Sequence, residues 1–150
     1  MRFDNNSPKS RLMTALTVII IIIAGIIGTF LKDGSEGTSY LAFHNGGYFT
    51  VKDENKSPTN VYYQDILSME YLNTADFSDA YGGATVEDSL RLGQWENSQL
   101  GTFCCCMDME LETCLLIRTE AEIYVINYES DETTLGLQDA ILRAQEQLSE

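Results

Sequence analysis

The stretch TCLLIRTEAEIYVINY, residues 113–128, decides the fold class expected for this chain. Apolar and β-branched residues dominate 113–119 and again 123–128, and the short polar turn at 120–122 separates the two runs. Apolar runs of four to eight residues bounded by turn signals are typical of β-strands. We therefore expect two neighbouring strands here and a domain built mainly of β-structure.

A third run, FCCCMD at 103–108, precedes this pair and carries three of the four cysteines. We expect residues 102–107 and 113–119 to form a hairpin around residues 108–112. Such a hairpin would place the cysteine-rich strand directly beside the strand that begins with the fourth cysteine.

Side chains alternate between the two faces of a strand, so Cys104 and Cys106 share one face and Cys105 takes the other. One turn length places Cys105 opposite Cys114, and a turn one residue longer places Cys106 there. We therefore interpret the cysteines as small apolar strand residues, with a cross-strand disulfide between Cys105 and Cys114 as the alternative.

We predict no catalytic, cofactor or metal site. Zinc would need three cysteines to converge with His44, the one histidine, and their spacing matches no paired-cysteine zinc pattern. A cysteine nucleophile would need a base, and His44 lies in a turn region beside Asn45. The densest carboxylates lack the spacing of an EF-hand calcium loop. These carboxylates are Asp76, Asp79, Glu87 and Asp88.

Strands are also expected before this region, and a helix is expected after it. Residues 40–52 contain two short runs around an Asn-Gly-Gly turn, 61–72 alternate as one strand, and 73–101 read as short strands joined by turns. Residues 133–148 place apolar side chains on one helical face, with Thr133 or Thr134 as N-cap. The pattern predicts about seven strands followed by one amphipathic helix.

Several of these stretches resemble the bacterial pleckstrin-homology-like (PH-like) domains, in particular small single-pass membrane proteins of Gram-positive bacteria. The resemblance lies in VYYQDILSMEYL (61–72), LGTF (100–103), CLLIRTEAEIYVINY (114–128) and the closing helix, and it covers about residues 40–148. It implies a seven-stranded, two-sheet bent sheet or barrel capped by the C-terminal helix, with no known enzymatic activity.

Residues 12–31, LMTALTVIIIIIAGIIGTFL, contain no charged side chain and match the thickness of a bilayer core. We predict a transmembrane helix here; a cleaved signal peptide and a buried core helix are the alternatives. Three basic residues precede it, so we expect residues 1–11 in the cytoplasm and the domain outside the cell membrane. Residues 32–39 form a short linker to the domain at 40–150.

The charge of the chain excludes several partners. Residues 1–32 hold four basic residues against Asp4, a charge of +3, so the total of -14 leaves -17 for residues 33–150. Nucleic acid and anionic lipid surfaces need clustered basic residues. Lys52 and Lys56 stand beside Asp53 and Glu54, which does not support phosphoinositide binding.

The function expected from these features is a non-enzymatic, membrane-tethered module that binds a protein or peptide. Tyr62, Tyr63 and Trp95 are the candidate partner surface. An extracytoplasmic redox- or metal-responsive sensor using Cys104 to Cys106 and Cys114 is the alternative. A third hypothesis is that the domain carries a small apolar ligand.

Overall fold

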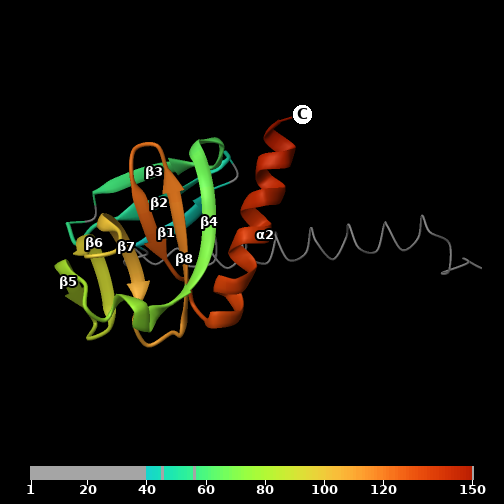
Figure 1. Ribbon diagram of the computed structural model, residues 1–150. Coiled ribbons are helices and arrows are strands. Elements are labelled where there is room, and N and C mark those ends of the chain that lie inside the picture. The colour runs from blue at the N-terminus through green and yellow to red at the C-terminus, as the bar shows by residue number, and fades with distance from the viewer. Residues whose placement is uncertain (1–39, 45, 56, 150) are drawn as a thin grey trace, which may run out of the picture. The chain divides into compact units, whose positions relative to one another are not determined.

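The computed structural model describes residues 40–44, 46–55 and 57–149, and the predicted membrane span at 12–31 lies outside them. In this part of the chain no helix is long and apolar enough to cross a membrane. The described residues form nine strands, two short 3-10 helices and one long helix (Figure 1). In chain order they are β1 (Leu41–His44), β2 (Tyr48–Lys52), β3 (Pro58–Tyr62), η1 (Tyr63–Asp65), β4 (Ile66–Asn73), η2 (Thr74–Phe77), β5 (Tyr81–Val86), β6 (Leu90–Asn97), β7 (Gly101–Asp108), β8 (Thr113–Thr119), β9 (Ile123–Ile126) and α2 (Asp131–Leu148).

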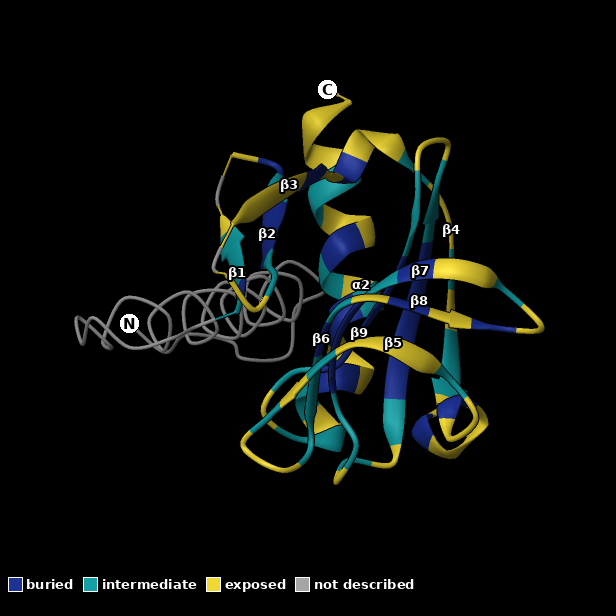
Figure 2. Ribbon diagram, turned by 90° about the vertical axis from the view of Figure 1, so that its left-hand side faces the viewer, coloured by how far each residue is buried: buried dark blue, intermediate teal, exposed yellow. Residues whose placement is uncertain are grey.

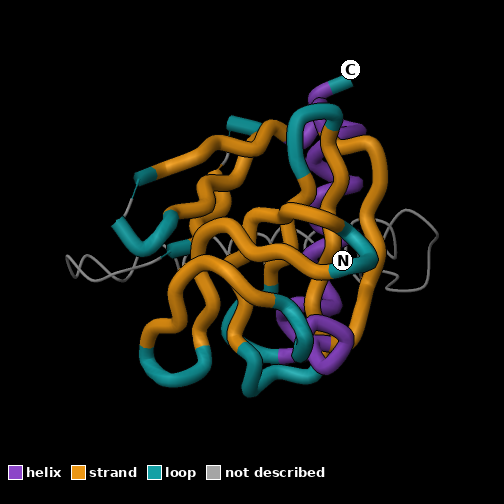
Figure 3. Tube along the Cα trace, turned by 60° about the vertical axis from the view of Figure 1, so that its left-hand side comes forward, coloured by secondary structure: helices purple, strands orange, loops and turns teal. Residues whose placement is uncertain are grey.

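The strands make two sheets, and they account for most of the described chain (Figure 3). A three-stranded antiparallel sheet has the order β1-β2-β3, and a six-stranded mixed sheet has the order β4-β8-β9-β7-β6-β5. The predicted PH-like seven-stranded barrel is therefore wrong. The domain is mainly β with a C-terminal helix, but it has nine strands, because residues 40–62 form a sheet of their own.

The predicted hairpin between residues 102–107 and 113–119 is also wrong, because β9 lies between β7 and β8. Val125 pairs with Cys105 of β7 in parallel and with Leu116 of β8 in antiparallel orientation. Tyr124, Val125 and Ile126 are all buried, so β9 is covered on both of its faces. A strand that is apolar on both faces is stable at the centre of a sheet and not at its edge.

Residues 61–72, predicted as one strand, are divided between the two sheets. β3 ends at Tyr62, η1 turns the chain, and β4 begins at Ile66 in the six-stranded sheet. Tyr63 is buried, with its ring stacked 6.4 Å from that of Phe49, and its carbonyl accepts a 2.6 Å hydrogen bond from Gln145 Nε2. Burial of Tyr63 therefore fixes the point where the chain passes from one sheet to the other.

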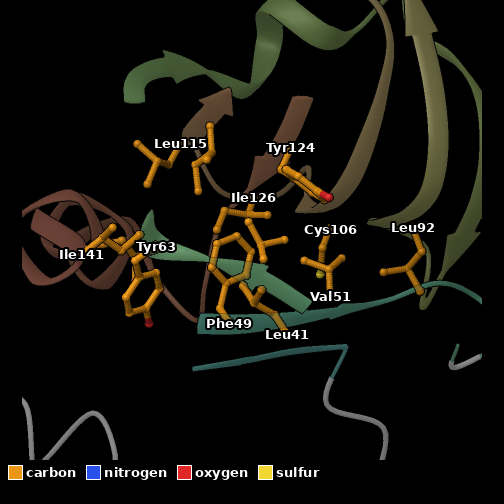
Figure 4. Close-up of a cluster of buried hydrophobic side chains, with 13 residues drawn as sticks. Leu41, Phe49, Val51, Tyr63, Leu92, Cys106, Leu115, Tyr124, Ile126 and Ile141 are labelled. Carbon is orange, nitrogen blue, oxygen red and sulfur yellow. The ribbon is translucent and has the colours of Figure 1, made fainter. Parts of the chain in front are cut away.

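The six-stranded sheet packs against a hydrophobic cluster on each face. The first cluster fills the space between this sheet, the three-stranded sheet and α2, where Phe49, Leu115 and Ile126 are fully buried (Figure 4). The second lies on the opposite face and includes Phe77 and Phe103. Buried residues accordingly concentrate on β7, β8 and β9, whereas β3 and β5 are largely exposed (Figure 2).

The helix α2 lies beside β4 and β8, at the opposite end of the six-stranded sheet from β5 (Figure 1). It begins two residues earlier than predicted, because Ser130 is the N-cap and its side chain accepts a hydrogen bond from Thr133 N–H. Leu137 and Ile141 are each 2% exposed and belong to the first cluster. Burial of this face holds the helix on the domain.

Candidate functional site

One side of the β3 backbone faces away from every other described strand, because β3 is the edge of its sheet. Tyr63 N–H donates to the carbonyl of Gly47 at 2.9 Å, in register with the pairing of β2 and β3. Hydrogen-bonded pairs alternate along antiparallel strands, so Val61 also bonds toward β2. The backbone N–H and C=O groups of Asn60 and Tyr62 therefore point outward from the sheet edge.

A hollow of about 460 Å³ runs along this edge, between β3 and the turn that joins β8 to β9. Two of its apolar side chains are well exposed, Tyr62 at 48% and Leu67 at 65%. Its lining residues are Asn60, Val61, Tyr62, Gln64, Asp65, Leu67, Thr119, Glu120, Ala121 and Tyr124. We call this hollow, together with the free edge of β3, the edge groove.

A second hollow of about 460 Å³ lies on the other side of the same turn. It shares Thr119, Glu120 and Ala121 with the edge groove, and adds Gln94, Thr102, Glu122 and Ile123. Across the two hollows, Asp65, Glu120 and Glu122 contribute carboxylates, and none of the described lining residues is a Lys, Arg or His. The described linings of the two hollows therefore carry negative charge only.

Three aromatic rings form a row across the outer face of the three-stranded sheet and end at the edge groove. His44 stacks on Tyr48 at 4.6 Å between ring centroids, and Tyr48 lies 5.4 Å from Tyr62. In the next row, Thr50 Oγ1 donates to Asn60 Oδ1 at 3.1 Å. Because a hydroxyl has one proton to donate, Thr50 Oγ1 accepts the 3.0 Å hydrogen bond from His44 Nε2. These contacts position the Tyr62 ring and the Asn60 amide at the groove.

The predicted partner surface of Tyr62, Tyr63 and Trp95 is not one surface. Tyr62 lines the edge groove, but Tyr63 and Trp95 are 6% and 7% exposed and belong to different hydrophobic clusters. The indole N–H of Trp95 donates to the carbonyl of Leu92 at 2.9 Å, and the guanidinium of Arg91 lies 4.6 Å from the ring centroid. Trp95 is thus a core residue whose polar atom already has a partner.

All four cysteines are free in the structure, and they lie on both faces of the six-stranded sheet. Cys106 belongs to the first cluster, whereas Cys105 and Cys114 belong to the second. Cys105 and Cys114 are on strands separated by β9. Two strand spacings amount to about 9.5 Å, which exceeds the reach of about 7 Å between Cα atoms in a disulfide. The register that made these two residues a candidate disulfide therefore does not form.

Burial holds the thiols in their protonated form. It raises the pKa of Cys106 and Cys114 to about 12, and that of Cys105 well above its usual value. Burial also raises the pKa of Cys104 to about 12, and the nearby carboxylates of Glu122 and Asp53 add to this effect. A protonated thiol is a poor nucleophile and metal ligand, so these residues serve as apolar strand side chains.

Across residues 40–44, 46–55 and 57–149, no group of three or more His, Cys, Asp or Glu side chains is placed to hold a metal ion. The candidate calcium carboxylates fall into two groups, with Asp76 and Asp79 in and just after η2 and with Glu87 and Asp88 in the turn between β5 and β6. His44 is exposed and bonds to Thr50, on the sheet that carries none of the cysteines. The thiols therefore have no histidine on their own sheet to act as base.

The sequence reasoning missed Asp65, Leu67 and Glu120 as residues of one hollow. It placed Leu67 on a continuous strand, and it treated the turn containing Glu120 as a simple connection. One signal was available: Ile66 and Leu67 are adjacent, and neighbouring side chains of a strand cannot both face one core. A proline at the start of a strand, as at Pro58, is likewise typical of an edge strand.

Comparison of the chain with protein-family models, with curated proteins and with solved structures finds no match. The resemblance to PH-like domains therefore stays a prediction, and the function has to be argued from the geometry of the edge groove.

Proposed function

We propose that this domain binds an extended segment of another protein, which adds to the free edge of β3 and lies in the edge groove. In this mode of recognition, main-chain hydrogen bonds supply affinity and pockets for alternate side chains supply specificity. The observation that carries the proposal is the outward direction of the Asn60 and Tyr62 backbone groups. Beside them, the exposed Tyr62 and Leu67 side chains supply apolar contact area.

A binding role without catalysis is supported by the chemistry of the groove. Burial, with a contribution from the carboxylate of Glu122, raises the pKa of the Tyr124 phenol to about 12, so this side chain stays neutral. The remaining described lining is apolar, amide, hydroxyl or carboxylate, and the Thr119 hydroxyl donates its proton to the carbonyl of Glu122 and not to a carboxylate base. We therefore assign the edge groove to recognition and not to a chemical step.

We also propose that residues 12–31 tether the domain to a cell membrane, with the domain outside. The support is the uncharged twenty-residue segment and the basic residues that precede it.

The test is a Gln147→Cys variant expressed in bacteria and treated with a membrane-impermeant thiol reagent. Gln147 is exposed, and the parent chain with its shielded thiols is the control. We expect labelling of the variant in intact cells and in the membrane fraction. Labelling only after lysis would overturn the orientation, and recovery in the soluble fraction would overturn the tether.

The groove proposal is tested with a phage-displayed library of random twelve-residue peptides, selected against the full chain in detergent micelles. We expect selected peptides to lose about ten-fold in affinity when Leu67→Ser removes a groove contact, which corresponds to ~1.4 kcal/mol. Asn60→Pro should weaken the same peptides by removing an outward N–H group from the edge of β3.

The matched control is Leu135→Ser, which removes a leucine of similar exposure, 53%, from α2 outside the groove. Its affinity for the selected peptides should equal that of the parent chain. Failure to enrich any peptide would contradict the proposal, as would peptides that are equally sensitive to both serine variants. Thermal unfolding of each variant shows whether a loss of binding reflects a loss of fold.

A further inference from the structure

We infer that the segment bound in the edge groove carries basic side chains, so that the ligand is a cationic extended peptide. This inference rests on the proposed function and adds the chemical class of the partner. It is drawn from the charge of the groove. The apolar contacts and the strand edge alone do not specify whether the bound peptide is charged.

Carboxylates line the path that an added strand would follow. Asp65 and Glu120 lie on the two sides of the edge groove, in η1 and in the turn between β8 and β9. Glu122 lies in the adjoining hollow, where its side chain accepts a hydrogen bond from the neutral amide of Gln94 and not from a cation. Among residues 40–44, 46–55 and 57–149, no basic side chain belongs to either lining, so no described cation neutralises these carboxylates from within the two hollows.

The Tyr62 ring gives a basic side chain a second favourable contact. It lines the same hollow as Asp65 and Glu120 and is about half exposed. An arginine or lysine head group can pack over a tyrosine face while it pairs with a carboxylate. A residue of the added strand that reaches this position would therefore meet a ring and two carboxylates together.

The spacing of an extended chain allows a second basic residue to contact the adjoining hollow. Residues i and i+2 of a strand share a face and lie about 6.8 Å apart. The two hollows share the residues of the turn from Thr119 to Ala121. An added strand that runs past this turn would therefore contact first one lining and then the other. We assign the Asp65 and Glu120 pair to one basic residue and Glu122 to the next on the same face.

The test compares three synthetic nine-residue peptides that alternate valine with arginine, with citrulline or with glutamate. Citrulline keeps the shape and most donors of arginine but carries no charge. We expect the arginine peptide to bind the full chain at least ten-fold more tightly than the citrulline peptide, and the glutamate peptide not to bind. The advantage of arginine should shrink as salt is raised from 50 to 500 mM, because salt screens exposed charges.

Asp65→Asn and Glu120→Gln should each weaken the arginine peptide about three-fold and leave the citrulline peptide unchanged, as removal of a partly exposed ion pair predicts. Glu132→Gln, in the first turn of α2 and outside both hollows, is the matched control and should change neither peptide.

Two failures are distinguishable. If the arginine and citrulline peptides bind equally well, and both are weakened by Leu67→Ser, the basic ligand is wrong and the groove proposal survives. If neither peptide binds, or if Leu67→Ser weakens neither, the groove proposal fails as well. An equal loss in Glu132→Gln would show general attraction to an acidic surface and would overturn the assignment of the three carboxylates.

Discussion

Asn60 shows how one residue can be fixed in place at an open edge. Its side-chain oxygen accepts from Thr50, and Thr50 in turn accepts from His44, so the amide is oriented by a hydrogen-bond chain across all three strands of its sheet. On the outward side, no strand of the described chain pairs with its backbone groups. A fixed side chain beside free backbone groups lowers the conformational cost of binding an added strand.

The cysteines show the opposite case, in which reactive chemistry is suppressed by burial. With a pKa of about 12, the thiol of Cys106 or Cys114 is ionised in about one molecule in ten thousand at pH 8. Reaction with a disulfide reagent requires the thiolate and access to it. The folded domain should therefore resist modification.

We predict that a colorimetric thiol titration of the folded full chain at pH 8 shows no fast-reacting cysteine. After unfolding in guanidinium chloride, all four should react, because the thiols are free and their pKa returns to about 8.5. A rapid stoichiometric reaction of the folded chain would refute the shielding. Fewer than four thiols without reductant would show a disulfide and revive the redox sensor.

At the scale of elements, the sequence predicted local structure better than pairing. The period of residues 133–148 predicted a helix, and of the apolar side chains on that face Leu137 and Ile141 are buried, whereas Leu148 is 42% exposed. The order of strands depends on contacts far apart in the chain, such as the parallel pairing of Cys105 with Val125. A strand that is apolar on both faces gives no sign of which neighbour it has.

The edge groove was equally hard to predict, because it joins residues from β3, η1 and the turn after β8. The chain passes from β3 to β4 at the point where Tyr63 is buried. The alternating apolar pattern of residues 61–72 predicted one continuous strand and gave no sign of this break. Tyr62 is about half exposed and lines the edge groove, whereas Trp95 is buried because its ring packs in the second cluster.

We predict that Leu137→Asp destabilises the domain strongly, because it places a carboxylate in a site that is 2% exposed. The loss of a buried leucine costs about 2–5 kcal/mol before the burial of a charge is added. The control is Leu142→Asp on the same helix, where the side chain is 42% exposed and the effect should stay within about 0.5 kcal/mol. Equal unfolding midpoints in urea for both variants would show that α2 does not pack on the core as described.

The two sheets have four edge strands, β1, β3, β4 and β5, and the last three of these differ in their surroundings. β4 lies beside α2, to which the Tyr71 hydroxyl donates a 2.6 Å hydrogen bond at the carbonyl of Leu135. β5 carries a register shift between Gly82 and Ala84, and a bulge of this kind twists an edge away from regular pairing. β3 has a hollow beside its outward backbone groups, so it is the edge of the three that suits an added strand.

The net charge of the domain is a second property that selects the partner binding at the edge of β3. A domain as acidic as this one repels phosphate-rich and acidic partners at a distance and attracts cationic ones. The carboxylates around the edge groove place that preference next to the strand edge. Shape and charge therefore favour one class of partner at one place on the surface.

Hydrogen exchange of the Asn60 and Tyr62 amides reports strand addition at β3 at the two residues whose N–H groups point outward. It is measured by NMR on the full chain in detergent micelles, with and without the alternating valine and arginine peptide at saturation. We predict that both amides exchange at least ten-fold more slowly with the peptide, because their outward N–H groups become bonded to the added strand. The amide of Val61, which bonds toward β2, is the internal reference and should change little. Unchanged exchange at Asn60 and Tyr62 in the presence of bound peptide would contradict strand addition at β3.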